Sequence, residues 1–287
     1  MGHSGRGRTD GIHESRAPGS EARGPRPVAA ASIPALLAGA LLLAGFAPLP
    51  RTAAAPDDDP RAVELVDRWI EAVGGMERYW QLETATFTLT TELYDAPSGR
   101  LKRARPRYVT IARTDAGELA RIERWEGDDF IQHGWDGARA WAVMNGETLE
   151  PGEKDYDEAS YVASDVNYWI ALPYKLRDPG VNLHYDGTDD EGREVVRVTF
   201  GEEVGDHQDV WRYRFGDGDV WPEQVEYVEE GKESVNRLRF EDITTVDGYV
   251  FVGRRVHFDE EGRITKILDT SDFRFNPEVD PGVFSGP

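Results

Sequence analysis

The segment "DVWRYRF", residues 209–215, alternates apolar and charged residues. Trp211, Tyr213 and Phe215 share one face of an extended strand and the arginines share the other, because side chains alternate in direction along a strand. The neighbouring segments repeat this pattern: "EVVRVTF" (194–200), "EQVEYVEE" (223–230), "SVNRLRFEDI" (234–243), "YVFVGRRVHF" (249–258) and "RITKILDTSDFRF" (263–275). Turns rich in glycine and acidic residues separate them, which predicts an antiparallel meander of long strands.

The same period of two appears earlier, in "TATFTLTTELY" (84–94). Ala85, Phe87, Leu89 and Leu93 share one face there, and threonines occupy much of the other, as is typical of a half-buried strand. Four further strands are expected, at 107–114, 118–127, 129–137 and 138–147. The chain as a whole therefore predicts about eleven strands.

A helix is expected at 57–75, before the first strand. Asp59 is placed to cap it and Pro60 to occupy its first turn, where a missing N–H costs nothing. Its apolar residues recur at spacings of three and four, which indicates one buried stripe. Gly74 and Gly75 are expected to end it. The residues expected on the stripe are Val63, Val66, Trp69, Ile70 and Val73.

A second helix is expected at 155–172, between the two groups of strands. Val162, Val166, Trp169 and Leu172 form its apolar face, and Pro173 ends it. The sequence continues as "YKLRDPG" (174–180), in which Asp178-Pro179-Gly180 is typical of a turn. Lys175, Arg177 and Asp178 do not form a recognisable reaction centre. We therefore expect a structural joint here, or the hinge of a lid.

These elements predict a mainly β protein with one large antiparallel sheet. One face of such a sheet is apolar and must be covered, and a sheet of this size curls. Two or so helices are available to cover it. The sequence thus predicts an incomplete antiparallel β-barrel wrapped around these helices, with residues 55–287 forming a single half-barrel domain.

Residues 1–54 differ from the rest of the chain. A stretch rich in arginine, glycine and proline precedes an uncharged run at 28–49, and small residues follow at 52–55. This order is typical of an export signal, with cleavage before Ala55. The run is also long enough to cross a bilayer, so an uncleaved membrane anchor is the alternative. Both interpretations place the domain outside the cytoplasm, in the periplasm or cell envelope.

Composition narrows the function. The chain has no cysteine, which excludes disulfides, thiolate metal sites and cysteine nucleophiles. Its net charge of −21 disfavours nucleic acid as a partner. We find no nucleophile motif, phosphate-binding loop or zinc-protease motif. The histidines at 133, 184, 207 and 257 are scattered, so surface histidines are favoured over a metal site.

Arginines and tryptophans remain as candidate functional residues. Arg103, Arg105 and Arg107 share one strand face, either as a basic rim for lipid headgroups or an acidic partner, or, as we favour, paired with acids on a neighbouring strand. The chain has eight tryptophans, which can line a ligand cavity or simply fill the core.

The order of these features resembles a known family. A leading helix ending in Gly-Gly, then Trp80, a long strand, a mid-sheet helix running into "LPYKLRDPG" (172–180) and the ending "FNPEVDPGVFSGP" (275–287) resemble an uncharacterised group of secreted bacterial proteins. That group is similar to the periplasmic lipoprotein-carrier (LolA-like) superfamily. The resemblance implies an incomplete barrel with helices over its open side and a hollow that binds acyl chains. The carrier family's functional arginine cannot be assigned, since Arg121, Arg124 and others match equally.

The sequence therefore predicts an extracytoplasmic, non-enzymatic carrier or binding protein for a lipid or lipoprotein acyl group. A monomer is expected, with no cofactor or metal. The hydrophobic ligand would occupy the hollow between the sheet and the 155–172 helix, bound by Trp125, Trp141, Tyr168, Trp169 and Leu172. The alternative is an envelope sensor or protein-interaction domain with an envelope protein partner, tethered to the membrane by residues 28–49.

Overall fold

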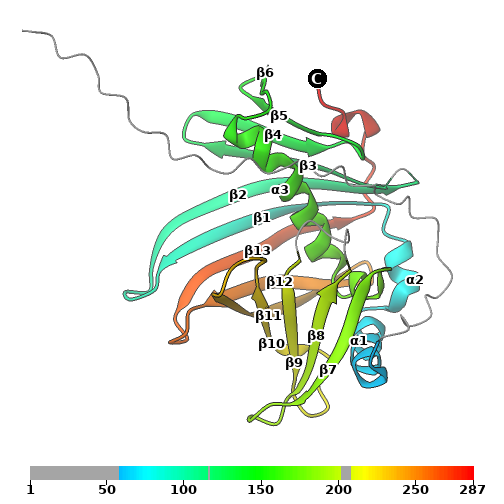
Figure 1. The fold of residues 1–287 in the computed structure, drawn as a ribbon. Helices are drawn as coiled ribbons and strands as arrows, with labels where there is room; N and C mark the ends of the chain where they lie inside the picture. The colour runs from blue at the N-terminus through cyan, green and yellow to red at the C-terminus, as the bar shows by residue number, and fades with distance from the viewer. Residues whose placement is uncertain (1–57, 116, 202–207) are drawn as a thin grey trace, which may run out of the picture. The chain divides into compact units, whose positions relative to one another are not determined.

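The computed structural model describes residues 58–115, 117–201 and 208–287 (Figure 1). The predictions for residues 1–54 and the turn at 202–207 lie outside these residues. The helices are α1 (Pro60–Ala72), α2 (Gly75–Trp80), α3 (Lys154–Ala171) and the 3₁₀ helices η1 (Tyr174–Arg177) and η2 (Pro281–Phe284). The strands are β1 (Thr84–Asp95), β2 (Arg100–Thr114), β3 (Gly117–Glu126), β4 (Asp129–Trp135), β5 (Ala140–Met144), β6 (Glu147–Thr148), β7 (Val181–Thr188), β8 (Glu194–Phe200), β9 (Val210–Phe215), β10 (Pro222–Val228), β11 (Val235–Val246), β12 (Tyr249–Phe258) and β13 (Ile264–Phe275).

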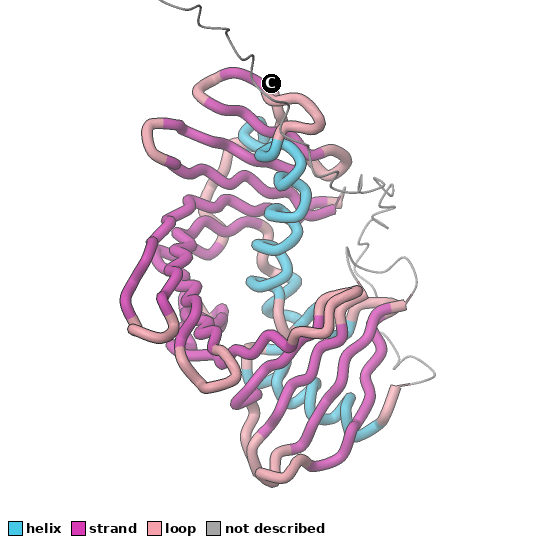
Figure 2. The backbone as a smooth tube through the Cα atoms, turned by 60° about the vertical axis from the view of Figure 1, so that its left-hand side comes forward, coloured by secondary structure: helices cyan, strands magenta, loops and turns pink. Residues whose placement is uncertain are grey.

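All thirteen strands of the described residues belong to one antiparallel sheet, in the order β6-β5-β4-β3-β2-β1-β13-β12-β11-β10-β9-β8-β7. The edge strands β6 and β7 do not pair with each other, so the sheet stays open. It curls around α3, which lies along its concave side (Figure 2). The predicted incomplete barrel wrapped around helices is therefore confirmed.

The sheet has two strands more than the sequence indicated. β6 has only two residues, too few for a pattern of alternation. β7, "VNLHYDGT", carries asparagine, histidine, aspartate and glycine among its apolar residues, and all four are uncommon or neutral in strands. Pairing with β8 forms β7 despite this weak local preference.

Helix α1 begins and ends close to the predicted positions, but its ends differ in detail. Asp59 occupies the cap position without capping, because its Oδ2 accepts a hydrogen bond from the Tyr185 N–H instead. The Asp59 N–H in turn donates to the Leu183 carbonyl. The segment before α1 thus satisfies part of the β7 edge, which would otherwise be open to pairing with another chain.

Gly74 ends α1 with a φ of 110°, a conformation that favours glycine. Gly75 was also expected to end the helix. It begins a second helix, α2, which the sequence did not indicate. The buried stripe of α1 includes Leu65, and Val63 is only half-buried. The other predicted members of the stripe are buried: Val66, Trp69, Ile70 and Val73.

Helix α3 ends at Ala171, two residues before Pro173, as predicted. The joint that follows is η1, in which Tyr174 and Leu176 are buried, while Lys175 Nζ lies 2.8 Å from the Glu118 carboxylate. The Val181 N–H then donates to the Asp178 carbonyl across a turn. This stretch packs and pairs as a structural joint at the end of α3.

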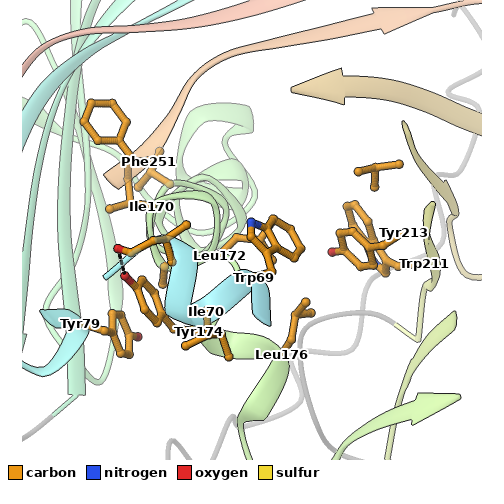
Figure 3. Packing of buried hydrophobic residues seen from close by; sticks show 14 of the residues in the cluster. Trp69, Ile70, Tyr79, Ile170, Leu172, Tyr174, Leu176, Trp211, Tyr213 and Phe251 are labelled. Atoms are coloured by element: carbon orange, nitrogen blue, oxygen red, sulfur yellow. Dashed lines mark hydrogen bonds between the residues drawn. The ribbon is translucent and has the colours of Figure 1, made fainter. Parts of the chain in front are cut away.

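The core lies between the concave face of the sheet and helices α1 and α3. Trp69 of α1 meets the ring of Tyr213 at a centroid distance of 5.5 Å. Tyr174 stacks on Tyr79 at 4.6 Å, and its hydroxyl donates to the Val73 carbonyl (Figure 3). Large rings therefore bridge the wide space between the sheet and its helices, where aliphatic side chains would leave voids.

Candidate functional site

A small cavity lies where the C-terminal half of α3 crosses β1, β12 and β13. Its free volume is about 10 Å³, roughly the room that one water molecule needs. No alkyl chain fits in so small a space. The cavity is lined by Phe87, Leu89, Val166, Trp169, Ile170, Val252, Arg255 and Thr270.

Aromatic rings hold this half of α3 against the sheet. The Trp169 ring lies 5.7 Å from that of Trp211, edge to face, and 6.4 Å from that of Phe240. The Tyr168 hydroxyl lies 3.4 Å from the Tyr213 hydroxyl. Burial raises the pKa of Tyr168 to about 12, so its phenol stays protonated and available for this hydrogen bond. Ring packing dominates these contacts, and few of them are hydrogen bonds. An interface of this kind between α3 and the sheet can separate and close again.

Arg255 is the unusual residue of the cavity. Its side chain comes from the middle of β12 and the residue is only 4% exposed. Its Cζ lies 4.1 Å from the centre of a Trp169 ring, within cation–π distance. In the described part of the chain, its Nη1 has no hydrogen-bond partner. Burial lowers the pKa of Arg255 to about 10, although the charge of Asp165 opposes this shift.

Asp165 brings a negative charge to the same place from α3. Its Oδ1 accepts a hydrogen bond from the Trp169 indole N–H at 2.9 Å. Burial lowers the pKa of Arg107 and of Lys266 as well, and the Asp165 charge raises both in opposition. One carboxylate of the helix thus acts on three partly desolvated cations from three strands.

Strand register places these cations on the concave face. Leu89, which lines the cavity, lies opposite Arg107 of β2 and Thr270 of β13. One row further, Arg255 lies opposite Leu268, which lies opposite Thr91. Directly opposed residues point to the same side of a sheet.

The next row continues the same face. His257 lies opposite Lys266, Lys266 opposite Leu93, and Leu93 opposite Arg103. The concave surface therefore changes from apolar beneath α3 to basic toward the turn that joins β1 to β2.

The arginine row of β2 has two kinds of partner. Arg103 and Arg105 reach the carboxylate of Glu126 at 2.9 and 3.2 Å, as the pairing interpretation predicted. Arg107 donates instead to the Thr91 hydroxyl at 3.1 Å. Arg107 is thus the member of the row that lies beside the cavity without an acid as hydrogen-bond partner among the described residues.

The other half of α3 is fixed to the sheet by charged groups. Arg124 of β3 forms an ion pair with Asp155 in the first turn of α3, and His133 Nε2 lies 3.5 Å from the same carboxylate. Burial lowers the pKa of His133 to about 4, and the charge of Arg124 adds to this shift. The N-terminal half of α3 is therefore tied down by a polar cluster, whereas the C-terminal half rests on rings and on one buried hydrogen bond from the Tyr249 hydroxyl to the Ile170 carbonyl.

Two histidines differ from the prediction of surface positions. His133 is fully buried and His257 is 6% exposed, because both occupy inward-facing positions of long strands. Among the residues that the structure describes, no group of three or more His, Cys, Asp or Glu side chains is placed to hold one metal ion.

The structure brings three of the five predicted ligand-binding residues to the region of the cavity. Trp169 lines it, Tyr168 packs beside Trp169 at a ring distance of 5.7 Å, and Leu172 is buried at the end of the helix. Their shared helix explains this, because α3 presents its C-terminal turns to the sheet.

The other two predicted residues lie on the opposite face of the sheet. Trp125 is 65% exposed beside Phe130, and Trp141 is covered by the C-terminal segment, where its indole N–H donates to the Phe284 carbonyl. Each is one residue away from an inward-facing position, and a shift of one residue reverses the direction of a strand side chain.

Arg255 and Asp165 were not among the sequence candidates. The available signal was "GRRVHF" (253–258), two adjacent arginines inside an otherwise apolar strand. Because side chains alternate along a strand, one of the two arginines must point inward. Burying a charge costs free energy, so such a residue is a candidate for a functional site.

Comparison with solved structures identifies the fold. A DUF1329 family protein from Desulfovibrio piger is 12% identical, with 80% of this chain and 98% of that chain covered and a TM-score of 0.52. A LolA superfamily protein from Nitrosomonas europaea is 13% identical, with 78% and 97% covered and a TM-score of 0.49. Neither protein-family profiles nor curated proteins match the sequence. The fold that the resemblance implied is confirmed, and at this identity the similarity concerns the fold alone.

Among the helices of residues 58–287 that the structure describes, none is long and apolar enough to cross a membrane.

Proposed function

We propose that this protein is an extracytoplasmic, non-enzymatic binding protein or carrier for a lipid or lipoprotein acyl group. The observation that carries the proposal is the way α3 meets the sheet. Its C-terminal half closes a cavity through Trp169 and Tyr168, next to a buried cation, while its N-terminal half is fixed by an ion pair. The predicted export signal at residues 1–54 supports the location.

In the structure α3 lies closed over the cavity. Opening requires the rings of α3 to leave Trp211 and Phe240, which exposes the apolar residues beneath the helix. An acyl chain then replaces the helix as cover, with about 0.8 kcal/mol gained for each CH₂ group buried. Leu172 ends the moving half, and Pro173 and η1 follow it as the joint to β7.

The test is extraction of bound lipid. The full chain is produced with its leader in a bacterial host, purified from the extracytoplasmic fraction, extracted with organic solvent and examined by mass spectrometry. We expect a stoichiometric acyl-containing compound with the wild type and with Trp125→Ala. Trp169→Ala should lose most of it. If no variant carries lipid and no fluorescent fatty acid binds in solution, the proposal fails.

A second candidate is a protein-interaction or sensor domain of the envelope. The observation that favours it is on the outer face of the sheet, where Tyr108 and Trp125 are 47% and 65% exposed and Phe130 lies beside Trp125. Exposed aromatic residues are enriched where proteins bind one another. A photo-crosslinking residue in place of Trp125, with one in place of Val220 as control, should then capture one partner in the envelope.

A further inference from the structure

We propose that the ligand carries an anionic headgroup, a carboxylate or a phosphate, which binds Arg255. The inference rests on the proposed function and names the class of ligand: an anionic amphiphile. The acyl chain occupies the apolar side of the cavity, and the headgroup lies on its basic side.

Arg255 is a buried guanidinium with an unpaired N–H group. A guanidinium has five N–H donors, and burying it without partners is costly. Arg255 is 4% exposed, yet its Nη1 donates to no acceptor in the described residues, and the ring of Trp169 is what covers it. Carboxylates and phosphates fit the fork of a guanidinium through two parallel hydrogen bonds.

Two further cations and one carboxylate surround Arg255. Arg107 and Lys266 contribute to the same concave face from β2 and β13, and Asp165 of α3 is the carboxylate that acts on all three cations. Asp165 leaves together with α3 when the helix moves. An open cavity would then expose Arg255 and Arg107 without this carboxylate, while Glu229 still acts on Lys266, so an anionic headgroup takes the place of Asp165.

The charge of Arg255 lies directly beside the apolar lining of the cavity. Arg255 borders the cavity together with Phe87, Leu89, Val166 and Ile170. An amphiphile with its headgroup on Arg255 therefore has apolar side chains in contact with the first carbons of its chain. A neutral lipid with no acceptor in its headgroup would leave Nη1 of Arg255 unpaired.

The chain offers a matched pair of variants to test this. Arg254 and Arg255 are adjacent, but Arg254 points to the other face, where it lies 3.8 Å from Glu241. Arg255→Met removes the charge and keeps an unbranched apolar side chain under Trp169. Arg254→Met makes the same chemical change on the outer face. Arg255→Lys keeps the charge and loses the fork.

The experiment uses the full chain, stripped of bound lipid, and four probes with the same twelve-carbon chain: dodecanoate, dodecyl phosphate, dodecanol and dodecyltrimethylammonium. Dissociation constants are measured by calorimetry below the micelle concentration of each probe. We expect one or both anions to bind at least about tenfold more tightly than dodecanol, as a charge-assisted hydrogen bond provides. The relative affinity of dodecanoate and dodecyl phosphate distinguishes a fatty acid from a phosphate headgroup.

Arg255→Met should reduce the preference for anions to about twofold or less, with dodecanol binding unchanged. Arg254→Met should retain the full preference, and Arg255→Lys part of it. If Arg255 served only to hold α3 through Trp169, Arg255→Met would change all four affinities alike, and the inference would be overturned.

The affinities of the four probes for the wild-type protein test the inference even if Arg255→Met does not fold. Equal binding of dodecanoate, dodecyl phosphate and dodecanol contradicts the anionic headgroup and leaves the proposed function intact. Absence of binding by all four probes contradicts the proposed function itself, and the inference with it.

Discussion

Single residues of this protein place costly charged and polar groups in its interior. Arg255 places a charge beneath Trp169, in a position that alternation would otherwise give to an apolar side chain. His257, two residues along the same strand and 6% exposed, faces Lys266 across the ladder. Natural cores contain such groups where a ligand or partner requires them, at a cost in folding free energy.

Arg255→Met should therefore raise the free energy of unfolding of the ligand-free protein by about 1–3 kcal/mol, because a well-packed apolar residue replaces a buried charge. The measurement is thermal unfolding by circular dichroism, in which we expect a rise in Tm of several degrees, on the order of 2–4 °C per kcal/mol. Arg254→Met should leave Tm within about 2 °C of the wild type. A fall in Tm for Arg255→Met would mean that its contact with Trp169 stabilises the fold.

His257 makes stability depend on pH. Burial lowers its pKa to about 2, with the nearby charges of Lys266 and Arg255 adding to the shift, whereas an unfolded histidine titrates near about 6.5. Below that pH the unfolded state binds a proton that the folded state does not, so stability is lost as pH falls from about 6.5. The loss approaches about 1.4 kcal/mol per pH unit for this residue.

The comparison is urea unfolding of the wild type and His257→Gln at pH 7.5 and 5.0. We expect His257→Gln to lose clearly less stability between the two pH values. Part of the slope should remain, because burial also lowers the pKa of His133, to about 4, and this contributes in the same direction. Identical slopes for the two proteins would contradict the assignment.

At the scale of elements, α3 has two halves with different chemistry. Its first turn is held by the Arg124–Asp155 pair, in which the side chains are 11% and 14% exposed. Its last turns rest on the rings of Trp211 and Phe240. A desolvated ion pair has a fixed geometry and holds the first turn of α3 in one position. Ring contacts do not depend on one geometry in this way.

Asp155→Ala should cost about 2–4 kcal/mol in the free energy of unfolding, because it leaves Arg124 buried without that partner. Hydrogen exchange should also become faster along the N-terminal half of α3. The matched control is Glu158→Ala, which removes an exposed pair with Lys154 on the same helix and should cost about 0.5 kcal/mol or less. Equal effects of the two variants would show that α3 is not fixed at its N-terminal half in this way.

At the scale of the whole molecule, a highly acidic chain of net charge −21 encloses a basic interior face. Arg103, Arg105 and Arg107 contribute to that face, and Glu126 neutralises part of it. An anionic headgroup would therefore be attracted to the interior of a protein whose exterior repels anionic surfaces.

The leader is predicted to export the whole chain from the cytoplasm. If the leader is a cleaved signal, N-terminal sequencing of the protein purified from an extracytoplasmic fraction should begin at Ala55. A variant with Ala54→Arg should accumulate uncleaved precursor. A full-length chain that stays with the membrane pellet would instead support the anchor formed by residues 28–49.

Much of the fold followed from local pattern. The period of two in "DVWRYRF" and its neighbours identified the meander, because side chains of an extended strand must alternate whatever the tertiary context. The stripe of α1 and the end of α3 before Pro173 were predicted for equally local reasons. By contrast, β7 is formed by pairing with β8 more than by its own sequence, and α2 begins at a glycine that was expected only to end α1.

Local sequence pattern was enough to predict a large antiparallel sheet, its apolar alternation and the helix that interrupts it. Which face of each strand is enclosed became clear from the three-dimensional fold. Trp125 and Trp141 have the composition of ligand contacts but point outward, while Arg255 has the composition of a surface residue and points inward. The reason is physical: alternation defines two faces, but the direction in which the sheet curls, and the strand register across it, depend on contacts between residues far apart in the chain.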